Sequence, residues 1–417
     1  MAGRPMSTCG PPRRQSRPRR PRREHPRLAA ADDRRRLRHR RLPPVDGGYA
    51  ARRFPPSASA AARHTEDKET LMQYSVLGAT GVKVSRICLG TATFGVAPTA
   101  QDADRVVGGA VDLGINFVDT ADVYGNMPVF DRPGAPAAAD REPAEQILGR
   151  ALRGRRDQMV IATKSNGIVG LDINDRGLSR RHIIRQVETS LRRLETDYID
   201  LYYAHDPDPD TPLEQTLAAY DDLIRQGKIR YVGLSNHPAW QVTHALWIAD
   251  DRRQQAPVAA QVKYNLIDRA AERELAPACQ QFGLSLVPYA PLHGGLLADL
   301  GVLDRDVAGD QRFGAAGFTE AEIAVGREVD RLGRAWGLAP YQVSLAWLLS
   351  RPAVASAIVG AETLDELRAN ATAADVELEP AQLDSLTELA SAPAAFDHRA
   401  GRGPERPPST TDPVSTD

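Results

Sequence analysis

Short runs of mainly apolar residues recur from residue 72 to about residue 390, separated by longer stretches with helical spacing. Most of the short runs are almost continuously apolar, which is typical of strands buried on both faces of a parallel sheet. The pattern predicts eight strands: Arg86–Ala92, Ile115–Ala121, Met159–Lys164, Tyr198–His205, Ile229–Asn236, Val258–Asn265, Leu284–Pro291 and Ala355–Ala361.

The stretches between these strands carry apolar residues on one helical face, with capping and stop signals at their ends. Ser179 is placed to cap a helix, and Gly114 and Gly227 are suited to end one. Pro340 opens a helix that stops before Pro352. We expect helices over Gln101–Leu113, Ser179–Leu194, Leu213–Gln226 and Tyr341–Leu349.

Eight strands that alternate with helices are typical of a (β/α)8 barrel, the TIM-barrel fold, and this is the fold class that we predict. An open doubly wound sheet is the alternative. Its Gly-x-Gly-x-x-Gly turn after the first strand is not found, since Gly90–Gly95 is GTATFG. The alternating segment Gln73–Ser85 is predicted to form a β-hairpin that closes the N-terminal end of the barrel.

The composition of the 417 residues is that of a globular chain, with 42% hydrophobic and 26% charged residues. No run of about 18 apolar residues occurs, so we expect no membrane span. Cys9, Cys88 and Cys279 lie far apart and match neither a metal-binding spacing nor a disulfide framework. This cysteine usage is typical of a reducing compartment, and we expect the protein to be cytoplasmic.

Charge divides the chain into a barrel at residues 72–390 and two tails. Residues 1–71 hold 19 Lys or Arg, 7 Asp or Glu and ten prolines, although the whole chain has a net charge of −1. Like charges and prolines leave little apolar surface to bury, so we expect this tail to be disordered. A solvated tail, or a true start at Met72, is favoured over a nucleic-acid-binding or targeting arm. Residues 391–417 are predicted to be a second flexible tail.

Polar residues follow the predicted strands at one end of the barrel, where active sites of this fold lie. Asp119 ends the second strand and Tyr124 follows it, while Lys164 ends the third strand and His205 the fourth. A lysine held near a tyrosine lowers the pKa of the phenol, and the carboxylate can keep the lysine charged. The phenol can then donate a proton to a carbonyl oxygen. A hydride must come from a cofactor such as nicotinamide, because no side chain can donate one.

Each of these four residues also has a structural interpretation. Asp119 can cap the next helix, Tyr124 can be a packing residue, and His205 precedes the loop sequence DPDPDTP. Lys164 is harder to explain in this way, because a buried unpaired lysine is costly. Their joint occurrence at successive strand ends favours catalysis.

The chain resembles the aldo-keto reductases over residues 73–378. The segments that carry the resemblance are GINFVDTADVYG, EQILGRAL, VIATK, DYIDLYYAHDPDPDTPLEQTL, GKIRYVGLSNH, QVKYN and VPYAPLHGGLL. The D-x4-Y spacing of the family falls on Asp119 and Tyr124, its lysine on Lys164 and its histidine on His205.

The resemblance implies an NAD(P)(H)-dependent oxidoreductase that interconverts an aldehyde or ketone with its alcohol and uses no metal. Tyr124 would be the general acid, assisted by Lys164 and Asp119, with His205 at the substrate oxygen. Ala290 stands where many relatives have a serine. The cofactor-binding residues that the resemblance implies are Ser235, Asn236 and Gln261 at the carboxamide, Tyr289 on the nicotinamide ring, Leu292 and Gly294 along the pyrophosphate, Gly360 beside the last strand and Asn370 at the adenine.

The segment Val359–Asn370 departs from relatives that prefer NADP, which carry basic or long polar side chains there. Glu362 and Glu366 stand where relatives often have Arg or Gln, and Arg368 is the one base nearby. Carboxylates repel a 2′-phosphate and can accept hydrogen bonds from ribose hydroxyls. We therefore expect NAD(H) to be used at least as well as NADP(H).

Loops at the strand ends set substrate choice in this fold. Arg132, Asp172 and Asn174 indicate a polar substrate such as a sugar, or are solvated loop residues. The loops concerned are Asn126–Pro143, Ser165–Leu178 and Ala298–Phe318.

An active reductase or dehydrogenase is the favoured function, with a small carbonyl or alcohol as its partner. The alternative is a binding module of the same fold, in which cofactor occupancy regulates a partner, as in the potassium-channel β-subunits that resemble this family. The sequence predicts neither the substrate, nor the direction, nor the oligomeric state.

Overall fold

The computed structural model describes residues 72–131, 134–304 and 317–390, and the structural statements below refer to these ranges. Eight parallel strands form one sheet, in the order β10-β3-β4-β5-β6-β7-β8-β9. Each strand overlaps one of the eight predicted runs, so the strand prediction is confirmed. The strands are β3 (Ile87–Gly90), β4 (Phe117–Asp119), β5 (Val160–Ser165), β6 (Ile199–Ala204), β7 (Ile229–Ser235), β8 (Ala259–Gln261), β9 (Ser285–Leu286) and β10 (Ala357–Gly360).

The sheet closes into a barrel because the segments at its two edges are hydrogen-bonded to each other. Leu286 of β9 forms a parallel bridge with Val354, which precedes β10. The Leu286 amide donates to the Ala353 carbonyl, and the Ile358 amide donates to the Pro288 carbonyl, both at 2.8 Å. The predicted (β/α)8 barrel is confirmed, and the open doubly wound sheet is excluded.

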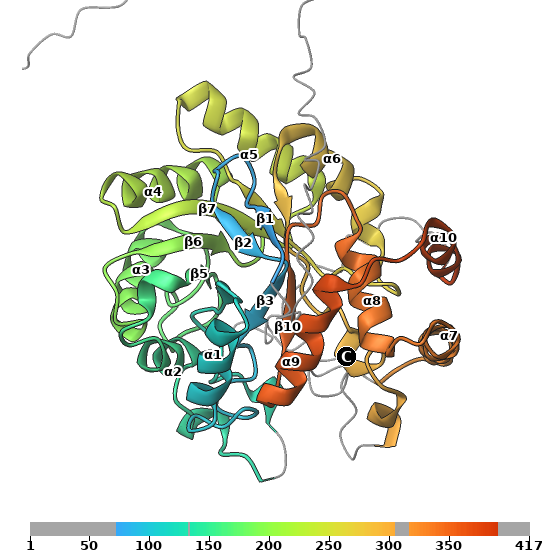
Figure 1. The fold of residues 1–417 in the computed structure, drawn as a ribbon. Coiled ribbons are helices and arrows are strands. Elements are labelled where there is room, and N and C mark those ends of the chain that lie inside the picture. Colours follow the sequence, from blue (N-terminus) through green and yellow to red (C-terminus); the bar gives the residue numbers. More distant parts are fainter. Residues whose placement is uncertain (1–71, 132–133, 305–316, 391–417) are drawn as a thin grey trace, which may run out of the picture. The chain divides into compact units, whose positions relative to one another are not determined.

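Helices follow the strands and surround the barrel (Figure 1). The four predicted helices correspond to α1, α3, α4 and α8, and Ser179 caps α3 by accepting from the His182 amide. The helices are α1 (Ala103–Asp112), α2 (Ala144–Ala151), α3 (Arg180–Arg193), α4 (Leu213–Arg225), α5 (Ala239–Arg252), α6 (Leu275–Phe282), α7 (Glu320–Trp336), α8 (Pro340–Leu349), α9 (Leu364–Thr372) and α10 (Pro380–Glu388). The short 3-10 turns are Pro128–Phe130, Ala138–Asp140, Arg156–Gln158, Ala270–Glu272, His293–Gly295, Leu300–Asp304 and Ala373–Asp375.

A two-stranded hairpin, β1 (Tyr74–Val76) and β2 (Lys83–Ser85), precedes the barrel as predicted. Ser75 Oγ donates to the Ala355 carbonyl at 2.7 Å, which ties the hairpin to the segment before β10. Leu77 is fully buried and packs on residues inside the barrel. The hairpin therefore covers the N-terminal end of the barrel (Figure 1), and the opposite end remains for a site.

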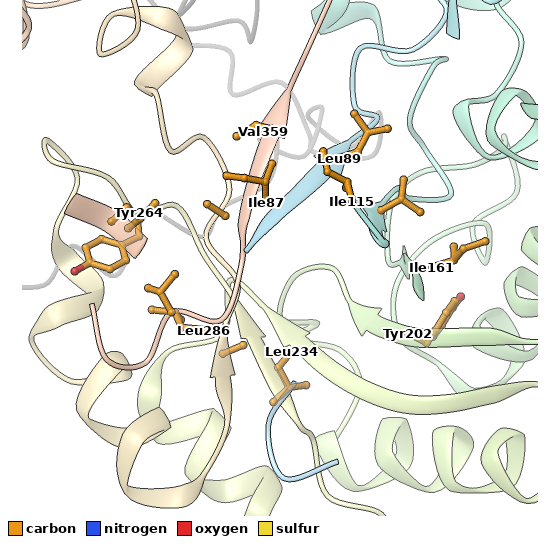
Figure 2. Close-up of a cluster of buried hydrophobic side chains, with 14 of the residues drawn as sticks. Ile87, Leu89, Ile115, Ile161, Tyr202, Leu234, Tyr264, Leu286 and Val359 are labelled. Carbon is orange, nitrogen blue, oxygen red and sulfur yellow. The ribbon is translucent and has the colours of Figure 1, made fainter. Parts of the chain in front are cut away.

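The larger part of the core lies between the sheet and the helices. Figure 2 shows part of it, including Leu89 of β3, Ile161 of β5, Tyr202 of β6 and Leu234 of β7. These four side chains are at most 1% exposed. Complete burial of one large apolar side chain contributes about 1.5–3 kcal/mol, so this layer holds the strands firmly in register.

A smaller cluster fills the interior of the barrel, and it includes Phe117, Ala162 and Tyr203. Side chains alternate between the two faces of a strand. The residues two positions further along β4, β5 and β6 therefore point to the same interior, at the end opposite the hairpin. These residues are Asp119, Lys164 and His205.

Some predictions concern residues outside the described ranges. The two tails, residues 1–71 and 391–417, belong to these, and so does Arg132. Among the described helices, none is both long enough and apolar enough to cross a membrane. The same ranges contain no cluster of His, Cys, Asp or Glu arranged to bind a metal ion.

Candidate active site

A buried ion pair lies at the carboxyl ends of β4 and β5. Lys164 Nζ is 2.5 Å from Asp119 Oδ1 and also donates to the Thr120 carbonyl at 2.9 Å. The exposed fraction is 0% for the Lys164 side chain and 4% for that of Asp119. Asp119 Oδ2 accepts from Gln261 Nε2 at 2.8 Å. The buried charges are therefore paired and hydrogen-bonded, as their burial requires.

Tyr124 and His205 complete this group. The Tyr124 hydroxyl accepts a hydrogen bond from Lys164 Nζ at 3.2 Å. The imidazole ring of His205 meets the Tyr124 ring edge-on, with 5.7 Å between the ring centres and an interplanar angle of 79°. The structure thus brings together the four side chains predicted for catalysis, from the ends of three adjacent strands.

Burial and charge set the protonation states of this group. Burial would lower the pKa of Lys164, but Asp119 and Tyr124 outweigh it, so the pKa is raised and the amine is charged. Burial raises the pKa of Asp119 against the opposing effect of Lys164. Burial lowers the pKa of His205 well below its usual range, and the charge of Lys164 lowers it further. The imidazole is therefore neutral at neutral pH.

The pKa of Tyr124 differs from the expectation drawn from the sequence. Burial raises it, and this effect is larger than the lowering caused by the charge and hydrogen bond of Lys164. Asp119 and Asp206 raise it further. Lys164 lowers the pKa of Tyr124 as expected, but the predicted net lowering of this pKa is wrong. The loss of water destabilises the phenolate more than the ammonium of Lys164 stabilises it. The phenol is protonated at neutral pH.

A second buried network holds the turn that carries Tyr124. Glu145 of α2 is fully buried and accepts from Thr163 Oγ1 at 2.7 Å and from Arg193 at 3.1 Å. Arg193 also donates to the Asp122 carbonyl at 2.9 Å. The segment EQILGRAL contains Glu145, but its partner Arg193 lies in α3 and carried no signal in the sequence.

Arg141 organises the longer loop after Tyr124. Its residue is 5% exposed, and its guanidinium donates to the carbonyls of Gly125 and Met127 at 2.6 Å and of Pro136 at 3.1 Å. Three carbonyls of one loop thus share one cation. An arginine in a polar loop is usually solvated, so the sequence could not indicate this role.

A cleft of about 2880 Å³ opens at this end of the barrel. This volume exceeds the roughly 300–1,000 Å³ of most small-molecule sites, so both a cofactor and a substrate have room. Lys164, Ser235 and Gln261 are buried behind the wall and do not line the cleft. The predicted site residues that line it are Asp119, Tyr124, His205, Asn236, Tyr289, Leu292, Gly294, Gly360 and Asn370.

Hydrogen-bonding groups at the end of β7 face the middle of the cleft. Asn236 Nδ2 donates to Asp206 Oδ1 at 2.9 Å, and Asn236 Oδ1 accepts from the Tyr289 hydroxyl at 3.1 Å. Ser235 Oγ is buried, has no hydrogen-bond partner in the described chain and does not line the cleft. Asn236 does line the cleft, so of these two residues it is the one that can contact a ligand, and the contact of Ser235 with a carboxamide stays a prediction.

The main chain after β9 has positive φ angles where it lines the cleft. The angles are 50° at Ala290, 47° at His293, 66° at Gly294 and 103° at Gly295. The amides of His293 and Gly295 donate within this turn, to the carbonyls of Ala290 and Leu292 at 3.1 and 3.0 Å. Gly294 lies between them and lines the cleft, at the position predicted from the sequence for the pyrophosphate.

Acidic residues surround the start of α9, beside the predicted adenosine end of the cleft. Glu362 and Glu366 both line the cleft. Glu366 also accepts from the Glu362 amide at 2.8 Å, so part of its role is to cap the helix. Arg368 pairs with Asp365 at 3.0 Å and does not line the cleft. A 2′-phosphate would therefore meet carboxylates here.

The rim of the cleft is less polar than expected. Asn174 lines the cleft, whereas Asp172 accepts from the Asn174 amide within its own loop and does not line it. Ile168, Ile173 and Trp240 do line it, with exposed fractions of 59%, 79% and 62%. The sequence analysis missed these three side chains. Ile168 and Ile173 lie in a loop, which has no period that indicates which way they face, and Trp240 lies in α5, a helix that was not predicted.

Known proteins resemble this chain over almost all of the described barrel. The model of the "Aldo/keto reductase family" matches residues 86–391. The "Uncharacterized oxidoreductase YrpG" of Bacillus subtilis is 36% identical over 330 residues, which cover 77% of this chain and 97% of the relative. The "Probable voltage-gated potassium channel subunit beta" of Arabidopsis thaliana is 34% identical over 336 residues, 76% and 96% of the two chains. The "Versiconal hemiacetal acetate reductase" of Aspergillus parasiticus is 31% identical over 350 residues, 76% and 96%.

The fold and the arrangement of the site are those of a barrel oxidoreductase that acts on carbonyl groups. The chain belongs to the aldo/keto reductase family. The predicted resemblance is thereby confirmed, and with it the general class of activity. Enzymes of this family generally use NAD(P)(H).

Proposed function

We propose that the protein is an NAD(P)(H)-dependent oxidoreductase that interconverts an aldehyde or ketone with its alcohol, with the catalytic unit in residues 72–390. The observation that carries this proposal is the bonding of Lys164 to both Asp119 and Tyr124 beside His205 in one cleft. These four groups supply a proton donor, a charge that stabilises the donor after proton loss, and a neutral hydrogen-bonding ring.

Tyr124 is the proton donor in the direction of reduction. Its phenol is protonated at neutral pH, because burial raises its pKa. When the phenol proton moves to the carbonyl oxygen, the hydrogen bond from Lys164 stabilises the phenolate that remains. Asp119 keeps Lys164 charged and in place. In alcohol oxidation the phenolate accepts the hydroxyl proton and the same contacts operate in reverse.

His205 orients the substrate oxygen. Its imidazole is neutral, because burial and then Lys164 lower its pKa. No described residue is hydrogen-bonded to the ring, so a ring N–H is available to the substrate oxygen. A neutral ring donates a hydrogen bond without competing with Tyr124 as the acid.

The chain also offers the groups that a dinucleotide needs. A bound nicotinamide would supply or accept the hydride, which no side chain can do. Asn236 and Tyr289 line the cleft and are our candidates for contact with the carboxamide and the nicotinamide ring, and Gly294 lines it where we expect the phosphates. Asn370 of α9 lines the cleft, and we expect the adenine there.

The acidic start of α9 supports use of NAD(H) at least as well as NADP(H). Glu362 and Glu366 line the cleft, and the one basic residue of this segment, Arg368, is paired with Asp365. A ribose with free hydroxyls can donate to these carboxylates, whereas a 2′-phosphate is repelled. A strong preference for NADPH in steady-state kinetics would contradict this part of the proposal.

The activity is tested by the loss of NADH absorbance with a panel of aldehydes, ketones and sugars, for wild type and Tyr124→Phe. Sugars belong in the panel because Asn174 lines the cleft. Loss of a general acid is expected to lower kcat by about 100-fold or more. Tyr198→Phe is the matched control, since the Tyr198 hydroxyl donates to Asp157 outside the cleft. Equal turnover by wild type and the Tyr124 variant would show that the proton donor is misassigned.

A cofactor-binding regulatory subunit is the second candidate, because one relative at 34% identity is named as a potassium channel subunit beta. Such a subunit would bind the cofactor but turn over slowly with every substrate. Fluorescence titration with NADH alongside the aldehyde panel separates the two candidates. Tight binding without turnover would favour the regulatory subunit.

A further inference from the structure

Asp206 follows His205 at the carboxyl end of β6 and lines the cleft. Its main-chain carbonyl accepts from Asn166 Nδ2 at 2.6 Å, which fixes the position of the residue. One carboxylate oxygen, Oδ1, accepts from Asn236 Nδ2 at 2.9 Å. The other oxygen has no hydrogen-bond partner in the described chain. One oxygen of a carboxylate in the cleft is thus available to a ligand.

The charge of Asp206 reaches the reaction centre. It raises the pKa of both Tyr124 and Tyr289. His205 beside it is neutral, and the ammonium that acts on it, Lys164, is held by Asp119 at 2.5 Å. No cation of the described chain therefore neutralises Asp206 directly.

Burial raises the pKa of Asp206 to about 6, against the hydrogen bond from Asn236 and the charge of Lys164. The carboxyl is therefore mostly ionised at pH 7 to 8. Because the raised pKa reflects loss of water from the anion, a positive charge brought by a ligand would restore part of that lost solvation.

The side chains that line the cleft carry an excess of negative charge, the same sign as that of Asp206. Ten Asp or Glu side chains line it, but only four Lys or Arg. Two of the four bases are already paired, Lys263 with Asp268 at 3.7 Å and Arg193 with buried Glu145 at 3.1 Å. A concave surface with an excess of one charge concentrates ligands of the opposite charge.

The rim contributes apolar surface. Ile168, Ile173 and Trp240 are more than half exposed where they line the cleft. Large exposed apolar side chains around a cleft are typical of a site that an apolar ligand covers. The Trp240 ring can also attract a cation to its face. The ligand that fits both features has an apolar body and a positive charge.

We propose that Asp206 determines specificity by selecting carbonyl or alcohol substrates that carry a positively charged nitrogen on an apolar body. This inference rests on the proposed function. The Asp206 carboxylate holds the cationic nitrogen, the rim covers the body, and the carbonyl oxygen lies between Tyr124 and His205. Neutral hydroxyl-bearing substrates, such as sugars, are the alternative that the test must exclude.

The test uses a pair of substrates that differ in charge but hardly in shape. para-(Trimethylammonio)benzaldehyde and para-tert-butylbenzaldehyde are isosteric, and only the first is a cation; para-(hydroxymethyl)benzaldehyde represents the hydroxyl donors. The discrimination ratio is kcat/KM for the cation divided by kcat/KM for its neutral isostere. It is measured for wild type, Asp206→Asn and a control, Asp251→Asn, which removes an exposed carboxylate of α5 that does not line the cleft. Differences in intrinsic reactivity cancel when the ratios of two proteins are compared.

We expect Asp206→Asn to lower the discrimination ratio by about tenfold, mainly through KM for the cation, as a partly screened single charge allows. Asp251→Asn should leave the ratio within about twofold, since exposed charges are strongly screened. In wild type the ratio should fall below pH 6, where Asp206 is protonated, and in the Asn variant it should not change with pH.

Each remaining outcome overturns one specific claim. If wild type reduces the neutral aldehyde but Asp206→Asn keeps the wild-type ratio, Asp206 does not select a cation. If the variant instead loses most on the hydroxymethyl substrate, hydroxyl donors are the class that Asp206 recognises, and our inference is wrong. If wild type reduces none of the three aldehydes with either cofactor, the proposed function itself fails.

Discussion

The ion pair of Lys164 and Asp119 allows the strongest test of the site, and Lys164→Met is the perturbation. The substitution removes the ammonium and keeps most of the volume of the side chain. It leaves Asp119 buried with one hydrogen bond, from Gln261, and leaves the Thr120 carbonyl without its donor. Removal of one partner of a buried pair costs about 3–5 kcal/mol, and we expect the free energy of unfolding to fall by that amount.

A double-mutant cycle separates the pair from other effects of the substitution. Asp119→Asn alone leaves the ammonium of Lys164 buried without its counter-ion and should also cost about 3–5 kcal/mol. The double variant contains no uncompensated charge, so its loss should be smaller than the sum of the two single losses by at least about 3 kcal/mol. Equilibrium unfolding in urea, followed by circular dichroism, measures all four proteins.

The loss of stability caused by Lys164→Met should also depend on pH, in a direction that the structure predicts. Burial raises the pKa of Asp119, and without Lys164 nothing of comparable strength opposes that effect. A carboxyl whose pKa is higher in the folded than in the unfolded state favours folding when protonated. The penalty of Lys164→Met should therefore be largest above the folded pKa of Asp119 and shrink as the pH falls through it. Additive single losses, or a penalty that does not change with pH, would refute the reasoning.

The other predictions concern the cofactor end of the cleft and the loop after Tyr124. Glu362→Arg should raise the preference for NADPH over NADH by about tenfold, roughly 1.4 kcal/mol, because a repulsive charge becomes attractive. Steady-state kinetics with both cofactors measures this preference. The control Glu377→Arg changes an exposed residue outside the cleft and should leave the preference unchanged. Arg141→Met should lower the free energy of unfolding by at least about 2 kcal/mol, because three carbonyls lose their donor. The matched variant Arg153→Met, at an exposed surface pair, should change the stability by less than about 1 kcal/mol, and equal losses in the two variants would contradict the role of Arg141.

The barrel could be predicted from the sequence because its strands are buried on both faces. Runs such as Met159–Lys164 contain a continuous apolar stretch, here Met159–Ala162, and the strand found there lies within or next to the run. Helices α7 and α9 were not singled out, although Thr319 and Thr363 cap them. Capping residues are common in loops, and a cap indicates a helix only when an apolar period follows it clearly.

Three of the four catalytic candidates, Asp119, Lys164 and His205, could be predicted because they lie at strand ends. Tyr124 lies in the turn after β4, and the D-x4-Y spacing of the family indicated it. Asp119 and Lys164 lie in regular strands, where alternation with Phe117 and Ala162 determines which way they point. Nothing comparable determines the direction of a residue outside the strands. Trp240, for example, lies in the first turn of α5, a helix that was not predicted, and lines the cleft.

The direction of the pKa shift of Tyr124 was predicted wrongly for a different reason, namely the relative size of two opposing effects. The sequence indicated that Lys164 lies near the phenol, and the effect of a nearby cation has a known sign. It contained no measure of how much water the fold removes from the ring. Burial proves to be the larger effect, so the phenol is held as an acid and the direction of proton transfer follows from the fold.

Asp119 and Asp206 are the same chemical group at the ends of two strands, β4 and β6, on either side of β5. Burial raises the pKa of both. Asp119 has a cation of its own, because Lys164 on the intervening strand bonds to it. Asp206 has only an amide, Asn236, and one oxygen without a partner in the described chain. A buried carboxylate that has lost water and has no cation of its own is stabilised most by a cation that the ligand brings. Asp206 is such a carboxylate and Asp119 is not, and this difference makes Asp206 a determinant of specificity.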